Sequence, residues 1–482
     1  MQKNSLKVNT LYSIIKSCST IIFPLITFPY ISRVLLTENV GKINFSSSIV
    51  SYFAMFASLG ITTYAVRECS YVKEDKMRLE KTSSEIFSIN ILTTIIAYIL
   101  LIVLLFIFPK LKSYNLLIVI QSLSIVFTTL GADWINTAME DFRYITLRTF
   151  FFQLLSLICM FLFVKSPGDY LKYAAITVIS SSGGNLVNIF YRRKYCKIKV
   201  GLHLNLKKHL PPILTLFAMI LAQQIFVNSD TTILGVIKGD YQVGLYTTSV
   251  KIYNIINTFI SSIAWVVMPK LATSFSKKDY VNINSILKFI IGFTCTIGIP
   301  IVLGLFLLAP EIIDFIAGPN YINASSSLRV LALALFFSLG WGVVMNMLLL
   351  PDGEDKVCLK ACSISAVMNI ILNLLFIPRY GLVAAALTTT LSQFIGLLVC
   401  IPKINKNITF YVSKKFIVAV LAGSISIVVI FLFNRLLLLT NTLFLILTIF
   451  ESSLVYFIIQ LLLKNYWVED MLKSLKKRVI NN

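Results

Sequence analysis

The chain has 482 residues, of which 57% are hydrophobic and only 13% are charged, and its mean hydropathy is +0.84. Soluble proteins carry about 45–50% apolar and about 25% charged residues, so the composition excludes an ordinary water-soluble enzyme, a disordered chain and a disulfide scaffold. The formal net charge of +22 is explained in a membrane protein by basic residues that collect in cytoplasmic loops, without a nucleic-acid partner.

Apolar segments recur along the whole chain at the length of membrane helices, which need about 20 mostly apolar residues. In chain order the fourteen segments are 10–32, 43–65, 86–108, 115–135, 144–164, 171–190, 210–234, 243–268, 286–308, 328–350, 358–378, 381–402, 416–434 and 442–463. The loops between them are too short for a separate folded domain. The sequence therefore predicts an all-α integral membrane protein with about 14 transmembrane helices and no extramembranous active site.

The first predicted helix contains two prolines and a deep lysine. Pro24 and Pro29 each remove a backbone hydrogen bond and bend a helix. They are hinge candidates for alternating access, although static kinks are also common in membrane helices. Lys16 would cost several kcal/mol in lipid, so it is expected to face a partner or a wet cavity.

Further along the chain, the helices predicted at 210–234 and 243–268 are unusually polar. The first carries Gln223, Gln224, Asn228, Ser229, Asp230, Thr231 and Thr232, and the second carries Thr247, Thr248, Ser249, Lys251, Asn254 and Asn257. Such runs either hold helices together or line a water-filled path, and a long run favours a path for a sugar over one for a lipophilic drug. Asp230 and Lys251 lie at depths that allow an ion pair. Asn369 and Asn373 share one face of a later helix.

The chain also predicts two halves. The basic segment 192–208 follows the sixth predicted helix, so we expect a six-helix lobe at 1–200, a second at 201–409, and two peripheral helices with a basic tail at 410–482. Weak self-similarity links the turn at Gly41 to the turn at Gly244. Two such repeats with a path between them are a common transporter plan.

Loop charge gives the orientation. With the N-terminus inside, the cytoplasmic loops hold about 29 Lys and Arg residues and the opposite side about 8. The positive-inside rule then places both termini in the cytoplasm.

The remaining titratable residues do not suggest a catalytic or metal site. His203 and His209 are the two histidines, and both fall in a lysine-rich stretch where solvated side chains are expected. The eight cysteines are scattered and form no metal-binding pattern. Asp133 is expected to be solvated, and Glu451 to have a structural role.

Four stretches in order resemble one family. They are Phe28 to Leu35 with Gly41; Ser58 to Glu68; Asp230 to Gly235 followed by Val243 to Tyr246, Lys251 and Met268-Pro269; and Leu350 to Lys356 with Asn369, Asn373 and Ile377 to Gly381. The chain thus resembles the O-antigen and capsule repeat-unit flippases of the Wzx type, in the superfamily that also contains multidrug extruders and lipid II flippases. One departure is the turn 36–40, Leu-Thr-Glu-Asn-Val, where the family often has a Gly-Pro-Glu-Gly-Tyr-like sequence.

This resemblance implies a substrate, a fold and a membrane. The substrate is an oligosaccharide repeat unit on undecaprenyl diphosphate, moved outward across the bacterial inner membrane. The fold is two pseudo-symmetric six-helix lobes around a central lumen, with two peripheral C-terminal helices. The polysaccharide polymerase of the pathway is the expected protein partner, and relatives couple transport to protons or sodium ions.

A polar and basic lumen fits such a substrate, because basic groups attract a diphosphate by charge-assisted hydrogen bonds. The residues expected to line it are Lys16, Arg33, Arg67, Arg148, Gln224, Lys251, Asn254, Asn369 and Asn373. Asp230 is the candidate for ion coupling or for neutralising Lys251. No cofactor or metal is expected.

Three alternatives remain open. A multidrug or organic-cation exporter of the same fold should have an acidic or aromatic pocket. A membrane glycosyltransferase or polymerase would need clustered carboxylates, and the longest outer loop, 309–327, holds only Glu311 and Asp314. In a pure scaffold the buried charges would have no purpose.

Overall fold

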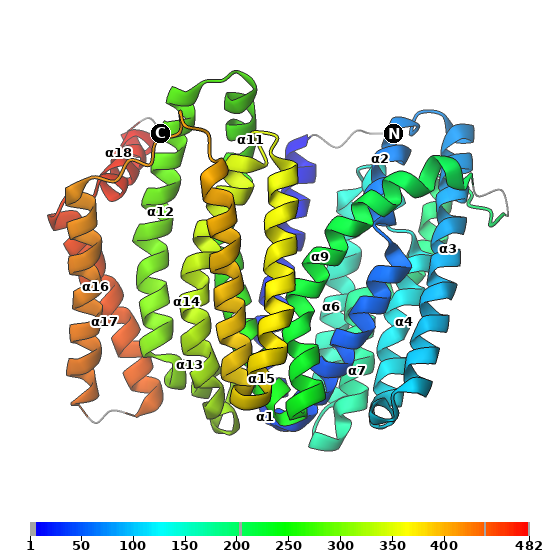
Figure 1. The fold of residues 1–482 in the computed structure, drawn as a ribbon, viewed down its shortest axis with the longest axis horizontal. Helices are drawn as coiled ribbons and strands as arrows, with labels where there is room; N and C mark the ends of the chain where they lie inside the picture. Colours follow the sequence, from blue (N-terminus) through cyan, green and yellow to red (C-terminus); the bar gives the residue numbers. More distant parts are fainter. Residues whose placement is uncertain (1–5, 202–204, 438–439, 481–482) are drawn as a thin grey trace. The chain divides into compact units, whose positions relative to one another are not determined.

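The computed structural model describes residues 6–201, 205–437 and 440–480, and every regular element in these ranges is helical (Figure 1). The chain divides into two compact units, residues 1–244 and 245–482. This confirms the all-α membrane fold. The predicted boundaries of the six-helix lobes, at residues 200 and 409, stay a prediction, because a compact unit need not coincide with a sequence repeat.

The first unit is built from nine helices and the first residues of a tenth. These are α1 (Leu6–Ser58), α2 (Ile61–Tyr71), α3 (Lys76–Ile107), α4 (Asn115–Gly131), α5 (Trp134–Ala138), α6 (Phe142–Phe163), α7 (Tyr170–Val178), α8 (Gly184–Tyr191), α9 (Leu206–Lys238) and the start of α10 (Asp240–Ser261). Asp75 begins α3 by accepting hydrogen bonds from the backbone of Met77 and Arg78 at 3.0 and 3.1 Å, as a helix cap does.

The second unit contains the rest of α10 and eight further helices. These are α11 (Ile263–Ser276), α12 (Tyr280–Leu307), α13 (Ala309–Ala317), α14 (Ser325–Gly342), α15 (Asp355–Cys400), α16 (Lys414–Arg435), α17 (Asn441–Leu462) and α18 (Tyr466–Ile480). A π-helical segment, Val343–Leu349, continues α14.

Nine helical stretches of the described residues are long and apolar enough to cross a membrane. Two of them, Ile22–Tyr71 and Asp355–Lys403, contain 50 and 49 residues, or roughly 75 Å at 1.5 Å per residue, more than twice the hydrocarbon thickness. Each contains a non-helical residue, Leu36 in α1 and Gly381 in α15, where the helix turns back on itself (Figure 1). The count of about 14 spans stays a prediction.

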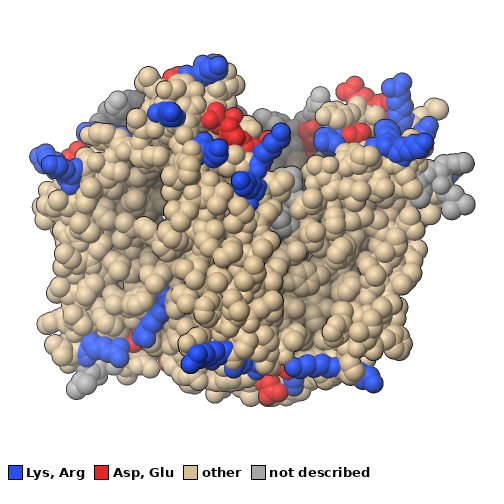
Figure 2. Space-filling model, in the orientation of Figure 1, with Lys and Arg blue, Asp and Glu red and all other residues tan. Residues whose placement is uncertain are grey.

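The charged and apolar side chains on the surface are distributed as expected for helices that cross a membrane. The charged side chains visible in Figure 2 lie near the ends of the helices, and the helix middles carry other residues. Large apolar side chains are exposed along these middles, for example Ile99 on α3 and Ile425 and Val429 on α16. An apolar helix surface of this kind suits lipid.

The helices α16 and α17 are attached to α12 by buried polar groups. The Tyr456 hydroxyl donates to the Thr296 carbonyl at 2.9 Å, and Asn465 Nδ2 donates to Thr296 Oγ1 at 3.2 Å. Gln460 Nε2 donates to the Ala419 carbonyl at 2.8 Å and thereby joins α17 to α16. Glu451, which the sequence predicts to be structural, accepts a bond from Asn434 Nδ2 at 2.8 Å.

Candidate functional site

The polar run of α9 packs against α1 in the first unit. Ser48 and Thr232 share a hydroxyl hydrogen bond at 2.9 Å, and Asn228 Nδ2 donates to Ser51 Oγ at 3.0 Å. Asp230 is buried and Gln224 is half-buried on the same helix. Part of the polar run therefore joins two helices, and a path lined by the rest stays a prediction.

The two turn glycines that the sequence pairs by similarity lie in one close contact. A Cβ atom on Gly41 would stand 1.8 Å from the Asp240 carbonyl oxygen and 3.0 Å from the Gly244 nitrogen. A Cβ on Gly244 would stand 2.1 Å from the Thr37 carbonyl oxygen. Burial raises the pKa of Asp240, and a 2.7 Å hydrogen bond from Tyr114 opposes this effect. Only glycine allows these backbones to approach so closely.

Three of the predicted basic residues of the first unit lie on α1 and α2. Lys16 is half-buried in α1, and Arg33 is exposed and donates to the Pro29 carbonyl at 2.8 Å. Arg67 lies on α2 with about half of its side chain exposed, 3.5 Å from Glu68 and over the Tyr64 ring. Pro24 and Pro29 both lie inside helical α1, and their hinge role stays a prediction.

Arg148 differs from these three because it is buried in an ion pair. Its guanidinium lies 2.9 Å from the Asp133 carboxylate, and only 8% of its side chain is exposed. Asp133 is therefore paired, and the expectation that it is simply solvated is wrong. A role of Arg148 in substrate binding stays a prediction.

A polar cluster lies beside this ion pair at the start of α6. Burial alone would raise the pKa of Asp141, but hydrogen bonds from Tyr191 and Tyr195 outweigh burial and hold it below its usual value. The Tyr144 and Tyr191 rings are stacked, with their centroids 3.5 Å apart. These contacts join the start of α6 to the end of α8.

In the second unit the predicted amide side chains differ in how deeply they are buried. Asn254 is exposed on α10, and Lys251 is half-buried one turn before it. Asn369 and Asn373 are fully buried, and Asn373 Nδ2 donates to Asn369 Oδ1 at 3.0 Å. Thr388 donates to Asn373 across the Gly381 turn, so this pair links the two arms of α15. The Asp230–Lys251 pair, which would join the two units, stays a prediction.

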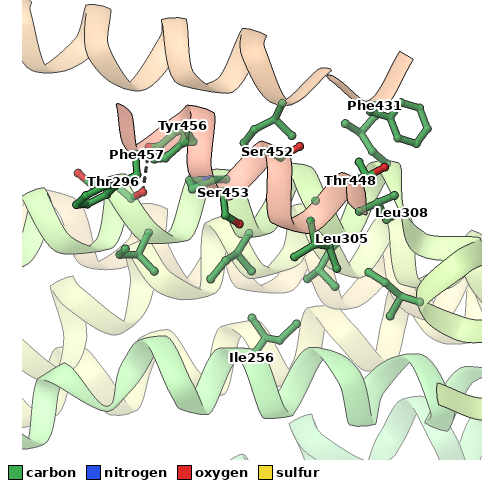
Figure 3. Close-up of a pocket in the computed structure, with 18 of the residues that line it drawn as sticks. Ile256, Thr296, Leu305, Leu308, Phe431, Thr448, Ser452, Ser453, Tyr456 and Phe457 are labelled. Atoms are coloured by element: carbon green, nitrogen blue, oxygen red, sulfur yellow. Dashed lines mark hydrogen bonds between the residues drawn. The ribbon is translucent and has the colours of Figure 1, made fainter. Parts of the chain in front are cut away.

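An apolar cavity of about 440 Å³ lies within the second unit (Figure 3). Its walls come from α10, α12, α13, α16, α17 and α18 and include Ile256, Gly304, Leu308, Phe431, Tyr456 and Trp467. A few hydroxyls, such as Thr448, Ser452 and Ser453, interrupt the hydrocarbon lining. The sequence did not single out this cavity, because its lining residues resemble any other lipid-facing apolar residue.

His209 is a second feature that the sequence missed. It is fully buried at the start of α9, between the Tyr64 hydroxyl at 2.8 Å and the Glu85 carboxylate at 2.9 Å. The expectation of a solvated side chain is wrong for His209, and His203 lies outside the described residues. No group of three or more His, Cys, Asp or Glu side chains in the described ranges could hold a metal ion.

The fold is shared with a known transporter structure. The lipid II flippase MurJ in an inward closed conformation superimposes with a TM-score of 0.74 at 20% identity, over 96% of this chain and 100% of that one. The chain is therefore a multi-pass membrane protein with a transporter fold. It belongs to the polysaccharide biosynthesis protein family, whose model matches residues 6–275, and the lipid II flippase MurJ model matches residues 189–458.

Two sequence relatives extend this similarity over most of the chain. The capsular polysaccharide biosynthesis protein CapF of Staphylococcus aureus is 25% identical, over 76% of this chain and 91% of that protein. A putative O-antigen transporter of Escherichia coli K12 is 24% identical, over 68% of this chain and 80% of that protein.

Proposed function

We propose that this protein is a flippase that moves oligosaccharide repeat units, linked to undecaprenyl diphosphate, from the cytoplasmic to the outer leaflet of the bacterial inner membrane by alternating access. The family and the named relatives support a lipid-linked glycan precursor as substrate. The protein then acts as a transporter and not as an enzyme, with both termini in the cytoplasm. The polymer is an O-antigen or a capsule.

The observation that carries the proposal is the presence of two unlike kinds of surface in one membrane chain. Basic and amide side chains, among them Lys16, Arg67 and Lys251, offer charge-assisted hydrogen bonds to a diphosphate and a glycan. The apolar cavity between α12 and α17 offers a hydrocarbon lining in the size range of ligand pockets. A substrate that needs both surfaces is amphipathic, with a charged head and a long apolar tail.

A multidrug exporter of the same fold is the second candidate, and its pocket should be acidic or aromatic to bind organic cations. The deep charges of this chain are mainly basic. Asp230 remains the candidate for coupling transport to a proton or sodium ion. The polysaccharide polymerase stays the expected protein partner.

The test is deletion of the gene in its host, scored for surface polysaccharide and for lipid-linked repeat units. Loss of polymer, with single repeat units held on the cytoplasmic leaflet, is the expected result. Complementation with Lys16→Ala or Lys251→Ala should fail although the variants reach the membrane, and the Lys→Arg variants should restore part of the activity. Intact polymer together with altered resistance to cationic dyes would instead establish the exporter.

A further inference from the structure

The first unit contains a buried hydrogen-bonded triad that the proposed transport mechanism does not use. His209 on α9 stands between Tyr64 on α2 and Glu85 on α3. Its Nδ1 lies 2.8 Å from the Tyr64 hydroxyl, and its Nε2 lies 2.9 Å from the Glu85 carboxylate. His209 is fully buried, Tyr64 is 2% exposed, and 12% of the Glu85 side chain is exposed. Both imidazole nitrogens are therefore engaged, one of them by a carboxylate.

We propose that His209 and Glu85, with Tyr64, form a proton-binding site that holds the start of α9 against α2 and α3. Imidazole changes its charge between pH 5 and 8. With a neutral imidazole, Nε2–H donates to the Glu85 carboxylate and Nδ1 accepts from Tyr64, which leaves one negative charge in a buried place. When a proton binds Nδ1, the pair becomes an imidazolium and a carboxylate, and the buried charge is neutralised.

The start of α9 is suited to separate from the rest of that helix. Pro211 and Pro212 lie inside α9, two and three residues after His209. Each proline lacks the N–H that would bond to the carbonyl four residues earlier, so the first turn, residues 206–210, is joined to the helix by fewer backbone bonds. Asn205 stands just before this turn in a left-handed conformation, with φ of 41°. The side-chain contacts of His209 therefore help to fix the first turn.

The linker before this turn is attached to the same helix as Glu85. The backbone N–H groups of residues 197, 199 and 201 donate to Glu80, Ser84 and Ser88 of α3 at 3.0, 3.0 and 3.1 Å. These three acceptors recur every four residues along one face of α3, and Glu85 lies one residue beyond Ser84. Residues 197–201 and the first turn of α9 thus both contact α3, and Glu85 lies between the acceptors Ser84 and Ser88.

Charged side chains lie close to the triad. The Arg67 guanidinium lies 5.5 Å from the centre of the Tyr64 ring and 3.5 Å from the Glu68 carboxylate. Lys207 and Lys208 stand exposed on α9 itself, and the thiols of Cys69 and Cys196 belong to the surrounding apolar cluster. An anion bound at Arg67 would favour the protonated triad, and by linkage a lower pH would favour the anion.

The protonation of His209 can be measured without overlapping signals, because the chain has only two histidines. Full-length His203→Gln protein, labelled with ¹⁵N-histidine in lipid nanodiscs, gives the imidazole signals of His209 alone. The same samples are followed by hydrogen exchange of residues 206–210, corrected for intrinsic exchange. We expect the imidazole signals of His209 and the protection of residues 206–210 to change at one common midpoint, with protection falling about tenfold as the pH rises.

The variants separate titration from packing. His209→Gln and Glu85→Gln should each remove the pH dependence of exchange, and the second serves if the first does not fold. Glu80→Gln is the matched control, because Glu80 lies on α3 and binds the linker but does not touch His209; it should keep the pH dependence. An imidazole that stays in one protonation state, or an unchanged pH course in Glu85→Gln, would overturn the proposal. No substrate is used, so this result is independent of the proposed flippase activity.

Discussion

Filling the apolar cavity tests whether it holds the hydrocarbon tail of the substrate. Gly304 on α12 lines the cavity, and a Cβ atom built on it meets no atom within 4 Å. A leucine there would project into open space. Replacement of a glycine inside a helix also favours the helix by roughly 0.5–1 kcal/mol, so Gly304→Leu should fold at least as well as the wild-type protein.

The magnitude follows from the volume that the leucine occupies. Its four carbons displace about four methylene-sized groups of a bound chain, at about 0.8 kcal/mol each. The loss is about 3 kcal/mol, or roughly a 200-fold weaker affinity, because each 1.4 kcal/mol is a factor of ten. Gly304→Ala adds one carbon and should weaken binding only about fourfold.

Binding of undecaprenyl phosphate to the purified variants, followed by the ligand-induced rise in Tm, measures this effect. Surface polysaccharide in complemented cells measures its consequence for transport. The reasoning fails if Gly304→Leu binds the lipid as the wild type does and restores the polymer, because a chain in the cavity could not tolerate the leucine. Equal loss in Gly304→Ala and Gly304→Leu would also contradict it.

Three further substitutions test the fold. Leu36→Gly should raise stability by about 1–3 kcal/mol in thermal unfolding, because Leu36 has φ of 62° and ψ of 172°, a backbone region that strains any residue with a side chain. Gly244→Ala should lower Tm by several degrees and reduce the amount of folded protein, because its Cβ would overlap the Thr37 carbonyl. Hydrogen bonds from Lys172 and from the 165 and 166 backbone hold the pKa of Asp169 well below its usual range. The contribution of the ionised Asp169 carboxylate to folding stability is therefore present above about pH 4 and lost below it. Between pH 6 and pH 3, the Tm of Asp169→Asn should fall less than the Tm of the wild type.

Hydropathy alone predicted an all-α membrane fold, because apolar length is a local property of the chain. The similarity between the stretches at Gly41 and Gly244 predicted a repeat and not the close backbone contact that the two glycines make. Even the family difference at position 36 marks a real feature, because Leu36 occupies a conformation that favours glycine.

The site was harder to predict, because burial depends on distant partners. His209 follows two lysines and precedes two prolines, so its neighbours in sequence indicate an exposed loop. Tyr64 and Glu85, 145 and 124 residues away, make it a buried residue instead. Arg148 shows the same limit, because the sequence suggests it as a lumen residue and says nothing of its ion pair with Asp133.

The position of the apolar cavity along the chain has a consequence for how the protein is made. Its walls begin at Ile256 and are complete only at Val468, so the ribosome must synthesise nearly the whole chain before the cavity exists. The hydrogen bonds of Tyr456 and Asn465 to Thr296 then attach the last helices to α12. A nascent or C-terminally truncated chain could insert most of its helices and still lack this cavity.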